Sequence, residues 1–455
     1  MRMCEIFWRR TLIVKASNER SDRTRVTIER LVIIINLVLL VGLGLVATTG
    51  AAMRKTLTPR ISIQEQYDDN IYLEPENEDS DWITVVSPGI SLDLETPDTT
   101  MNLDYEAGFS FYQDDTNMNS TRHQGRVAWD QRLTRYLTLN ISDTFVRSED
   151  PIWEAEGRIE EIARERGIYY RNSGEASLSY EFGAEDQITA GYRNGYVDDR
   201  SSRDEDSVGH EGFLALDTWF TPQFGTNITS RYNRAEFELE EWDDFEQYGA
   251  GLTINYRWQP TRRLYARYDL LYQDFEGEPT AYQTDDYRVH QGALGIGVTL
   301  GPNTDFNIEG GYFLQDYLNG DENDGVTFNG SFTTRTQRLS MSLAASGGYD
   351  QDYFSAENLG SFKYRQVLGT ANYLLTESVR IFGSASYRWE DFLETDPDRK
   401  DEVWRGTAGL SFSFWRWLTL SLEGTHSQRD SDYSRMEFDD NRVMLRLTGA
   451  YPYQL

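Results

Sequence analysis

The chain has 455 residues, a formal net charge of -31 and a mean hydropathy of -0.62. So large an excess of carboxylates would repel phosphates, which argues against nucleic acid as a partner. With 28 tyrosines and 11 tryptophans, the chain is also too aromatic for a disordered protein.

One apolar run near the start, residues 31–47, is long enough to cross a bilayer as a helix. Several arginines precede this run, and small residues follow it up to Ala52. This layout is typical of a secretory signal peptide, with cleavage expected after Ala51 or Ala52. Because the run is long for a signal peptide, an uncleaved membrane anchor is the alternative interpretation.

The predicted division of the chain is therefore a helical leader over residues 1–52 and one mature domain over residues 53–455. The stretch before the apolar run is unusually long, so we expect translation to begin near Val26. The single cysteine, Cys4, lies in the leader, which leaves the mature protein without a thiol for disulfides, zinc binding or nucleophilic catalysis. Removing the leader takes away eight basic and four acidic residues, so the mature protein is more acidic still.

From about Arg60 to the C-terminus, apolar and polar residues alternate in strand-length segments. In residues 339–349, for example, Leu339 and Leu343 share one face and Ser340 and Ser342 the other. The segments are about 10–14 residues long, enough for a tilted strand to cross a membrane and about twice the usual length in globular proteins. Aromatic residues gather at the segment ends, as in interfacial girdles. The pattern favours strands that face lipid over a soluble all-β domain.

The connections between the segments alternate strictly between short turns and long acidic loops. Thr96–Thr99 and Arg416–Trp417 are examples of the short links, and residues 70–81 and 430–440 of the long ones. Short periplasmic turns with long external loops are the outer-membrane arrangement. The sequence thus predicts an all-β fold, a single transmembrane antiparallel up-and-down β-barrel of about 20 strands with both termini on the short-turn side.

The C-terminus carries a further sign. Thr448, Ala450, Tyr453 and Leu455 resemble the terminal recognition pattern of outer-membrane barrels, with leucine in place of the usual final aromatic residue and alanine in place of the usual glycine. An ordinary last strand is the alternative interpretation.

If the apolar faces look outward, the alternation also predicts which side chains look inward. The candidate pore-lining residues are Asp104, Glu106, Arg126, Arg193, Arg231, Arg257, Arg267, Asp269, Glu309, Arg388, Glu390, Arg405 and Glu423. Asp130, Arg442 and Arg446 fall on the same face. A barrel of about 20 strands is wide enough for a water-filled channel, and this lining of mixed charge would suit one.

The surplus acid lies in the loops, above all in residues 68–81 and 236–246. A rim of one sign would bias which solutes enter, and it offers ligands for divalent cations that bridge to anionic lipid headgroups. A solvated surface is the alternative. No loop has a complete EF-hand spacing, because the nearest, residues 319–324, lacks glycine at the required sixth position.

The longest loop runs from Glu149 to Gly167. Its charged residues surround Ile159, Ile162 and Ala163, which predicts a short helix with a small apolar stripe. We expect residues 149–168 to fold into the mouth of the barrel and narrow it, with an exposed helical loop as the alternative.

The histidines do not indicate catalysis. His123, His210 and His290 recur in a His-Gln-Gly or His-Glu-Gly context, and the alternation places all three outward at the extracellular rim. His426 and Ser427 are adjacent in sequence and would point to opposite faces, so they would not form a dyad. Asp104 and Glu106 share a face, as a glycosidase pair would, but acids are common in porin lumens. We expect no enzyme activity, cofactor or metal centre.

Two short segments near the mature N-terminus carry a family resemblance. They are Tyr67-Asp68-Asp69-Asn70-Ile71 and Pro88-Gly89-Ile90-Ser91. This opening resembles the outer-membrane β-barrel proteins of bacterial exopolysaccharide gene clusters, including those associated with the PEP-CTERM sorting system. Beyond about residue 95 the resemblance rests on strand rhythm and length alone. It implies an outer-membrane location in a Gram-negative envelope and a role in polymer synthesis or export, and that family has no established catalytic residues to transfer.

The function predicted from the sequence is a porin-like channel in contact with outer-membrane lipid that passes a polysaccharide, its fragments or small hydrophilic solutes. A non-conducting barrel that scaffolds an envelope assembly through its loops is one alternative. An outer-membrane hydrolase is another.

Overall fold

The computed structural model describes residues 53–149, 152–155, 158–161, 167–200, 206–238, 244–276, 286–318, 320, 322–353, 359–393 and 399–455. The predicted leader, with its cleavage site and start position, lies outside these residues. Among the helices of the described part, none is long and apolar enough to cross a membrane.

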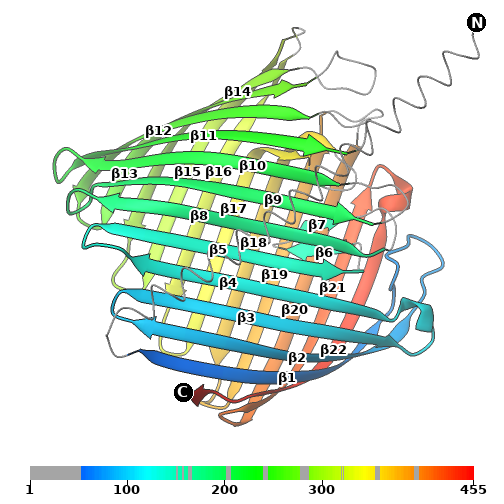
Figure 1. Ribbon diagram of the computed structural model, residues 1–455. Coiled ribbons are helices and arrows are strands. Elements are labelled where there is room, and N and C mark those ends of the chain that lie inside the picture. Colours follow the sequence, from blue (N-terminus) through cyan, green and yellow to red (C-terminus); the bar gives the residue numbers. More distant parts are fainter. Residues whose placement is uncertain are drawn as a thin grey trace, which may run out of the picture.

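Twenty long strands form the wall (Figure 1). In chain order they are β1 (Arg54–Asp68), β2 (Asp81–Thr96), β3 (Thr99–Tyr112), β4 (Ser120–Arg132), β5 (Leu137–Ser148), β8 (Tyr169–Glu181), β9 (Gln187–Asp199), β10 (Ser207–Trp219), β11 (Phe224–Phe237), β12 (Phe245–Gln259), β13 (Arg262–Phe275), β14 (Tyr287–Thr299), β15 (Thr304–Tyr317), β16 (Glu322–Arg335), β17 (Leu339–Asp352), β18 (Gly360–Leu374), β19 (Val379–Phe392), β20 (Arg399–Trp415), β21 (Leu418–Ser431) and β22 (Phe438–Ala450).

Every wall strand pairs antiparallel with the next one along the chain, and β5 pairs directly with β8. The last strand returns to the first: β22 pairs with β1 from Arg442 opposite Asp68 to Ala450 opposite Arg60. The short β23 (Tyr453–Gln454) continues this seam against Leu57 and Thr56. The sheet is therefore closed, which confirms the predicted antiparallel up-and-down barrel of about 20 strands.

The outer surface of the wall is apolar. Large hydrophobic side chains stand exposed at every second position, for example Ile61 and Ile63 on β1 and Leu252 and Ile254 on β12, each 41–53% exposed. In water such a surface would be strongly unfavourable, whereas in a bilayer it is the expected one. Aromatic pairs mark its short-turn edge, with the stacked Trp415 and Trp417 rings 5.3 Å apart. The apolar side of these strands faces lipid.

The two ends of the barrel differ as the sequence predicts. Short turns join the strands at one end, where the positive φ of Gly301 fits a tight connection. The long connections all lie at the other end, and two of them contain single 3₁₀ turns, η1 (Thr116–Met118) and η2 (Ser434–Met436). The first and the last described residues of the chain both lie at the short-turn end (Figure 1).

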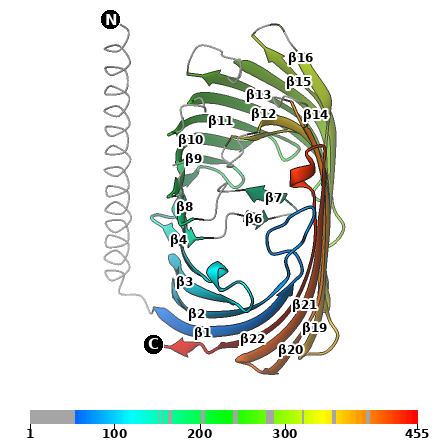
Figure 2. The same ribbon diagram turned by 90° about the vertical axis from the view of Figure 1, so that its right-hand side faces the viewer.

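The predicted helix in residues 149–168 is wrong. Residues Ile152–Ala155 form β6 and Arg158–Glu161 form β7, which pair antiparallel as a separate two-stranded sheet. A helix this short gains too few hydrogen bonds to offset its nucleation, whereas two paired segments satisfy each other's backbone groups. Viewed from the long-loop end, the β6–β7 hairpin lies within the outline of the barrel (Figure 2).

Candidate solute path

The candidate pore-lining residues lie on wall strands, on the face opposite the exposed apolar side chains. Alternation along each strand places them there: Asp104 and Glu106, for example, flank the exposed Tyr105. The structure brings most of these residues into ion-paired groups, and Arg60, Glu175, Glu185 and Glu211 join these groups as partners from outside the candidate set.

The first group joins β1 and β3. Arg60 donates from Nη2 to Asp104 (2.8 Å) and from Nε to Glu106 (3.1 Å). Gly89 on the intervening β2 makes room for Arg60, because a Cβ at position 89 would lie 2.7 Å from its Nε. The two carboxylates that share a face in the sequence are thus the counterions of one arginine. Arg126 of β4 stands opposite Asp104 in the strand register.

A second group spans β8, β9 and β10. Arg193 donates to Glu175 at 2.9 Å and to Glu211 at 2.7 Å, and its guanidinium lies 4.3 Å from the centre of the Phe213 ring. The arginine is therefore held between two neighbouring strands while one face stacks on an aromatic side chain. Its partners occupy directly opposite register positions, which the sequence does not reveal.

The next inward residues follow on β12 to β15. Arg257 lies 3.8 Å from the centre of the Trp219 ring and donates to Glu185 at 3.1 Å. Arg267 donates to the nearly buried Glu309 at 2.6 Å, and its Nε lies 3.3 Å from Asp269.

The remaining groups lie on β18 to β21. Arg388 donates to Glu390 at 2.6 Å and to Gln366 at 2.9 Å, and it lies over the Tyr364 ring. Asp401, which was not among the candidates, is fully buried between Arg399 (2.7 Å) and Arg429 (3.2 Å).

Arg231, Arg405 and Glu423 occupy further inward positions of the wall. Arg231 lies against Gly249, where a Cβ would come within 2.6 Å of its side chain. Arg405 stands opposite Ser386 and Ser427, and Glu423 opposite Gly409.

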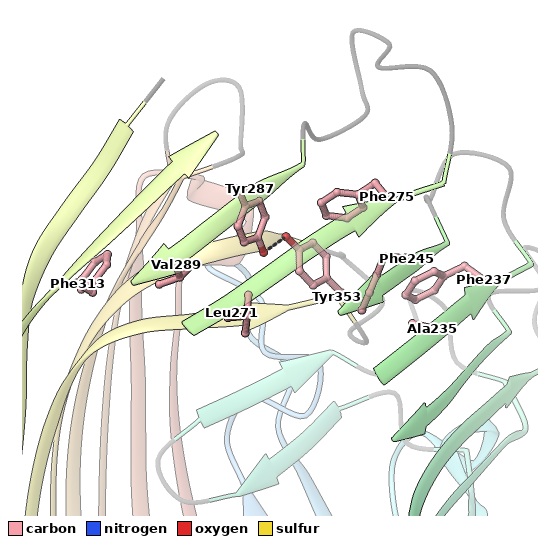
Figure 3. Packing of buried hydrophobic residues seen from close by; sticks show 9 residues of the cluster. All are labelled: Ala235, Phe237, Phe245, Leu271, Phe275, Tyr287, Val289, Phe313 and Tyr353. Carbon is pink, nitrogen blue, oxygen red and sulfur yellow. Dashed lines mark hydrogen bonds between the residues drawn. The ribbon is translucent and has the colours of Figure 1, made fainter. Parts of the chain in front are cut away.

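An aromatic cluster covers part of the inner surface near the long-loop end (Figure 3). Its members are Ala235, Phe237, Phe245, Leu271, Phe275, Tyr287, Val289, Phe313 and Tyr353. Eight of them come from β11 to β15, and Tyr353 directly follows β17. The mouth is thus lined differently from the ion-paired wall below it.

The three recurring histidines point outward, as predicted. The Nδ1 atom of each histidine forms a hydrogen bond with the hydroxyl of a tyrosine on the preceding strand. The pairs are Tyr105 with His123 (2.7 Å), Tyr192 with His210 (2.5 Å) and Tyr268 with His290 (2.8 Å). These tyrosines are 44–48% exposed on the apolar face. His426 instead contacts Asn441, while the adjacent Ser427 is buried on the opposite face. Within the described residues, no cluster of three or more His, Cys, Asp or Glu side chains is suited to a metal.

Known proteins resemble the chain in part. Residues 237–451 match a family model described as "Putative beta-barrel porin 2". Among solved structures, the chain is similar to OpdK of Pseudomonas aeruginosa with vanillate (12% identity, 88% of this chain and 99% of that chain, TM-score 0.41). It is also similar to the siderophore receptor PirA from Pseudomonas aeruginosa (11%, 87% and 80%, TM-score 0.48) and to a BenF-like porin from Pseudomonas fluorescens (14%, 89% and 99%, TM-score 0.40). No curated protein matches the chain.

The closed wall, the apolar outer face and the family match over residues 237–451 point to one kind of protein. A closed barrel satisfies all its strand edges internally, which an open sheet in lipid does not. This chain is a closed β-barrel of the bacterial outer membrane.

Proposed function

We propose that the barrel is a channel that passes a polysaccharide, its fragments or other small hydrophilic solutes across the outer membrane. The observation that carries this proposal is the inner wall, where arginines and carboxylates are held in pairs and arginines stack on aromatic rings. Residues 1–52 then serve as an export leader for the barrel of residues 53–455.

The ion-paired wall suits a solute that carries many hydroxyl groups. Sugars offer both donors and acceptors, so paired guanidinium and carboxylate groups hydrogen-bond them on either side of the pair. Because the positive charges of Arg193 and Arg267 are already balanced by carboxylate partners, these two arginines attract no anion strongly. Weak binding at many sites is what passage requires.

Aromatic side chains on the inner face add a second kind of contact. Trp219 and Phe213 lie on β10 with the guanidinium groups of Arg257 and Arg193 over their rings. Flat apolar surfaces next to hydrogen-bonding groups are complementary to a sugar ring, which has apolar C–H faces and polar edges. The resemblance of the N-terminal segments to barrel proteins of exopolysaccharide clusters supports the same class of cargo.

The proposed path includes the thirteen candidate residues from Asp104 to Glu423, and the acidic loops at its outer end are proposed to attract divalent cations from the lipid headgroup region. The barrel uses no cofactor in this proposal and carries out no reaction. The barrel selects solutes by their size and by the hydrogen bonds that they form with the inner wall.

One observation favours a second candidate function. The aromatic cluster and the β6–β7 hairpin both occupy the region of the mouth. A barrel narrowed there permanently would be a non-conducting scaffold that presents its loops to an envelope assembly.

Planar-bilayer recording on purified residues 53–455 separates the two candidates. We expect discrete conductance steps, and we expect added oligosaccharides to interrupt the current for a measurable time. Trp219→Ala should shorten these interruptions several-fold, whereas Phe220→Ala, at the next and 72% exposed position, should leave them unchanged. Absence of steps, together with no swelling of proteoliposomes in small sugars, would favour the scaffold.

A further inference from the structure

Strand β17 loses one of its two neighbours at its extracellular end. It pairs with β18 over its whole length, up to Asp352 opposite Gly360. Its pairing with β16 stops earlier, at Gly347 opposite Phe328. The described residues Glu322–Thr327 of β16 therefore pair with β15 alone and leave an edge of the wall free.

Two glycines allow β17 to turn at this point. A Cβ at Gly347 would lie 2.4 Å from the Phe328 ring and 3.0 Å from the carbonyl oxygen of Tyr364. Gly348 has a φ of +152°, a conformation that other residues rarely adopt. Simple alternation from the exposed Leu343 would send Tyr349 toward lipid, but the turn at Gly348 sends it inward, where it packs 5.9 Å from the Phe313 ring.

The end of β17 then docks on the inner wall around one hydroxyl group, that of Tyr287 on β14. Tyr353 lies 2.9 Å from this oxygen, Tyr349 donates to it at 2.8 Å and Gln351 donates from Nε2 at 2.5 Å. Figure 3 shows the Tyr353 hydroxyl directed at Tyr287, with Phe245 beside the Tyr353 ring. Tyr287 and Phe245 are 0% and 2% exposed, so this contact is closely packed.

The distance along the wall between the strands that meet here shows that the end of β17 has left the wall. Gln247 of β12 donates to Gln351 of β17 at 2.8 Å, although five inter-strand steps separate these strands in the sheet. Five steps correspond to roughly 24 Å along the wall. Ser361 on β18 makes a second attachment and accepts from Gln315 at 3.2 Å.

We propose that the outer end of β17 and β18, residues 348–353 and 359–362 and hereafter the tip, is a gate. In this structure the tip is docked across the lumen. In the second position it pairs with the free edge of β16 and continues the existing register, with Tyr349 opposite Val326 and Gln351 opposite Asp324. That movement closes the wall and clears the inner face of β12 to β15.

Each position satisfies a different set of groups, which is what a two-state element requires. Docking pairs the side-chain hydroxyl and amide groups and buries apolar surface, whereas the second position pairs the backbone of two strand edges. The gate rests on the proposed function, since it controls the path through the barrel.

Residue 351 can report both positions with cysteine pairs in a background of Cys4→Ser, which removes the only native thiol. Gln247→Cys with Gln351→Cys, bridged by a short bis-methanethiosulfonate reagent, fixes the docked tip. Asp324→Cys with Gln351→Cys forms a direct disulfide only when the tip pairs with β16. We expect both cross-links to form, and the second to raise single-channel conductance several-fold over the first, with reduction reversing both effects.

These outcomes separate the gate from the channel. Conductance without any 324–351 disulfide would show that the tip is fixed and would overturn the gate while the channel stands. Equal conductance in the two locked forms would also overturn the gate. Absence of conductance in both locked forms and in the unlocked protein would overturn the channel and the gate with it.

A glycine variant tests the same equilibrium without cross-links. Gly348→Ala disfavours the positive φ of the docked position, so we expect higher conductance and faster formation of the 324–351 disulfide. Gly369→Ala on β18 is the control, because a Cβ there would meet only ordinary contacts, the nearest at 3.7 Å. Heat-modifiable migration on gels verifies folding of both variants. Unchanged conductance and unchanged disulfide rate in Gly348→Ala would contradict the gate.

Discussion

Replacing Asp401 by asparagine should destabilise the barrel strongly. Its carboxylate is fully buried and accepts hydrogen bonds from Arg399 (2.7 Å) and from Ser431 (2.6 Å), and it lies 3.2 Å from Arg429. Both arginine side chains are also largely buried, at 3% and 12% exposed. Asparagine would keep the shape and remove the negative charge that lies between the two guanidinium groups. Removing one partner of a buried ion pair costs about 3–5 kcal/mol.

A loss of this size lowers the ratio of folded to unfolded protein by a factor between about 100 and about 4,000. Urea unfolding in lipid vesicles, followed by tryptophan fluorescence, measures it directly. Glu402→Gln is a matched control at the next position, because Glu402 faces outward and its hydrogen bond from Tyr387 is exposed, so we expect a loss below about 1 kcal/mol. If Asp401→Asn costs no more than Glu402→Gln, the buried cluster does not depend on its charge and the reasoning fails.

Three further predictions concern the outer face, the rim and the mouth. Ile228→Arg should cost about 2–4 kcal/mol in the same urea assay because it puts a charge into lipid, whereas Thr229→Arg on the inner face should cost far less; equal losses would contradict the assignment of faces. Changing Glu74, Glu76, Glu78 and Asp79 together to the corresponding amides should lower the cation-to-anion permeability ratio obtained from reversal potentials, and a constant ratio would show that the rim does not steer ions. Deleting residues 152–166 should raise single-channel conductance, and an unchanged value would refute a constricting role for the β6–β7 hairpin.

Strict alternation made the barrel predictable. In each strand, side chains alternate between the lipid-facing and the lumen-facing side, so even a single strand such as residues 248–258 reveals its two faces. The regular alternation of short turns and long loops then indicates that neighbouring strands are antiparallel and that the number of strands is even. The inward set followed from the same rule without any knowledge of contacts.

The ion-pair partners of the inward residues were harder to predict than the lipid-facing and lumen-facing sides of a strand, because these partners depend on the register between strands. Arg60 and Asp104 are far apart in sequence and meet only because β1, β2 and β3 align and Gly89 leaves a gap between them. Asp401 was missed for a related reason: its two arginines come from the same strand and from the next, and only the register joins all three. A weak sign was available in the Arg399-x-Asp401 spacing, which puts both side chains on one face.

The two departures from the predicted barrel both occur at the mouth, where alternation stops governing the chain. Residues 149–168 have no lipid-facing period, so a charge-rich segment was assigned to a helix although it forms the β6–β7 hairpin. In β17 the consecutive glycines Gly347 and Gly348 mark the place where one face becomes the other.

The lumen is therefore built in two parts with different physical roles. Near the mouth, the tip covers the aromatic cluster, and access depends on whether the tyrosine and glutamine contacts around Tyr287 are made or broken. Deeper in the barrel, Arg193, Arg267 and their carboxylates belong to strands paired on both sides, so they stay in place whichever position the tip takes. A solute would thus meet the tip, with its hydroxyl, amide and aromatic groups and the carboxylates of Asp350 and Asp352, before the ion-paired wall. In the proposed gate, the tip controls passage and the wall strands paired on both sides select the solute, so the two roles belong to different parts of the barrel.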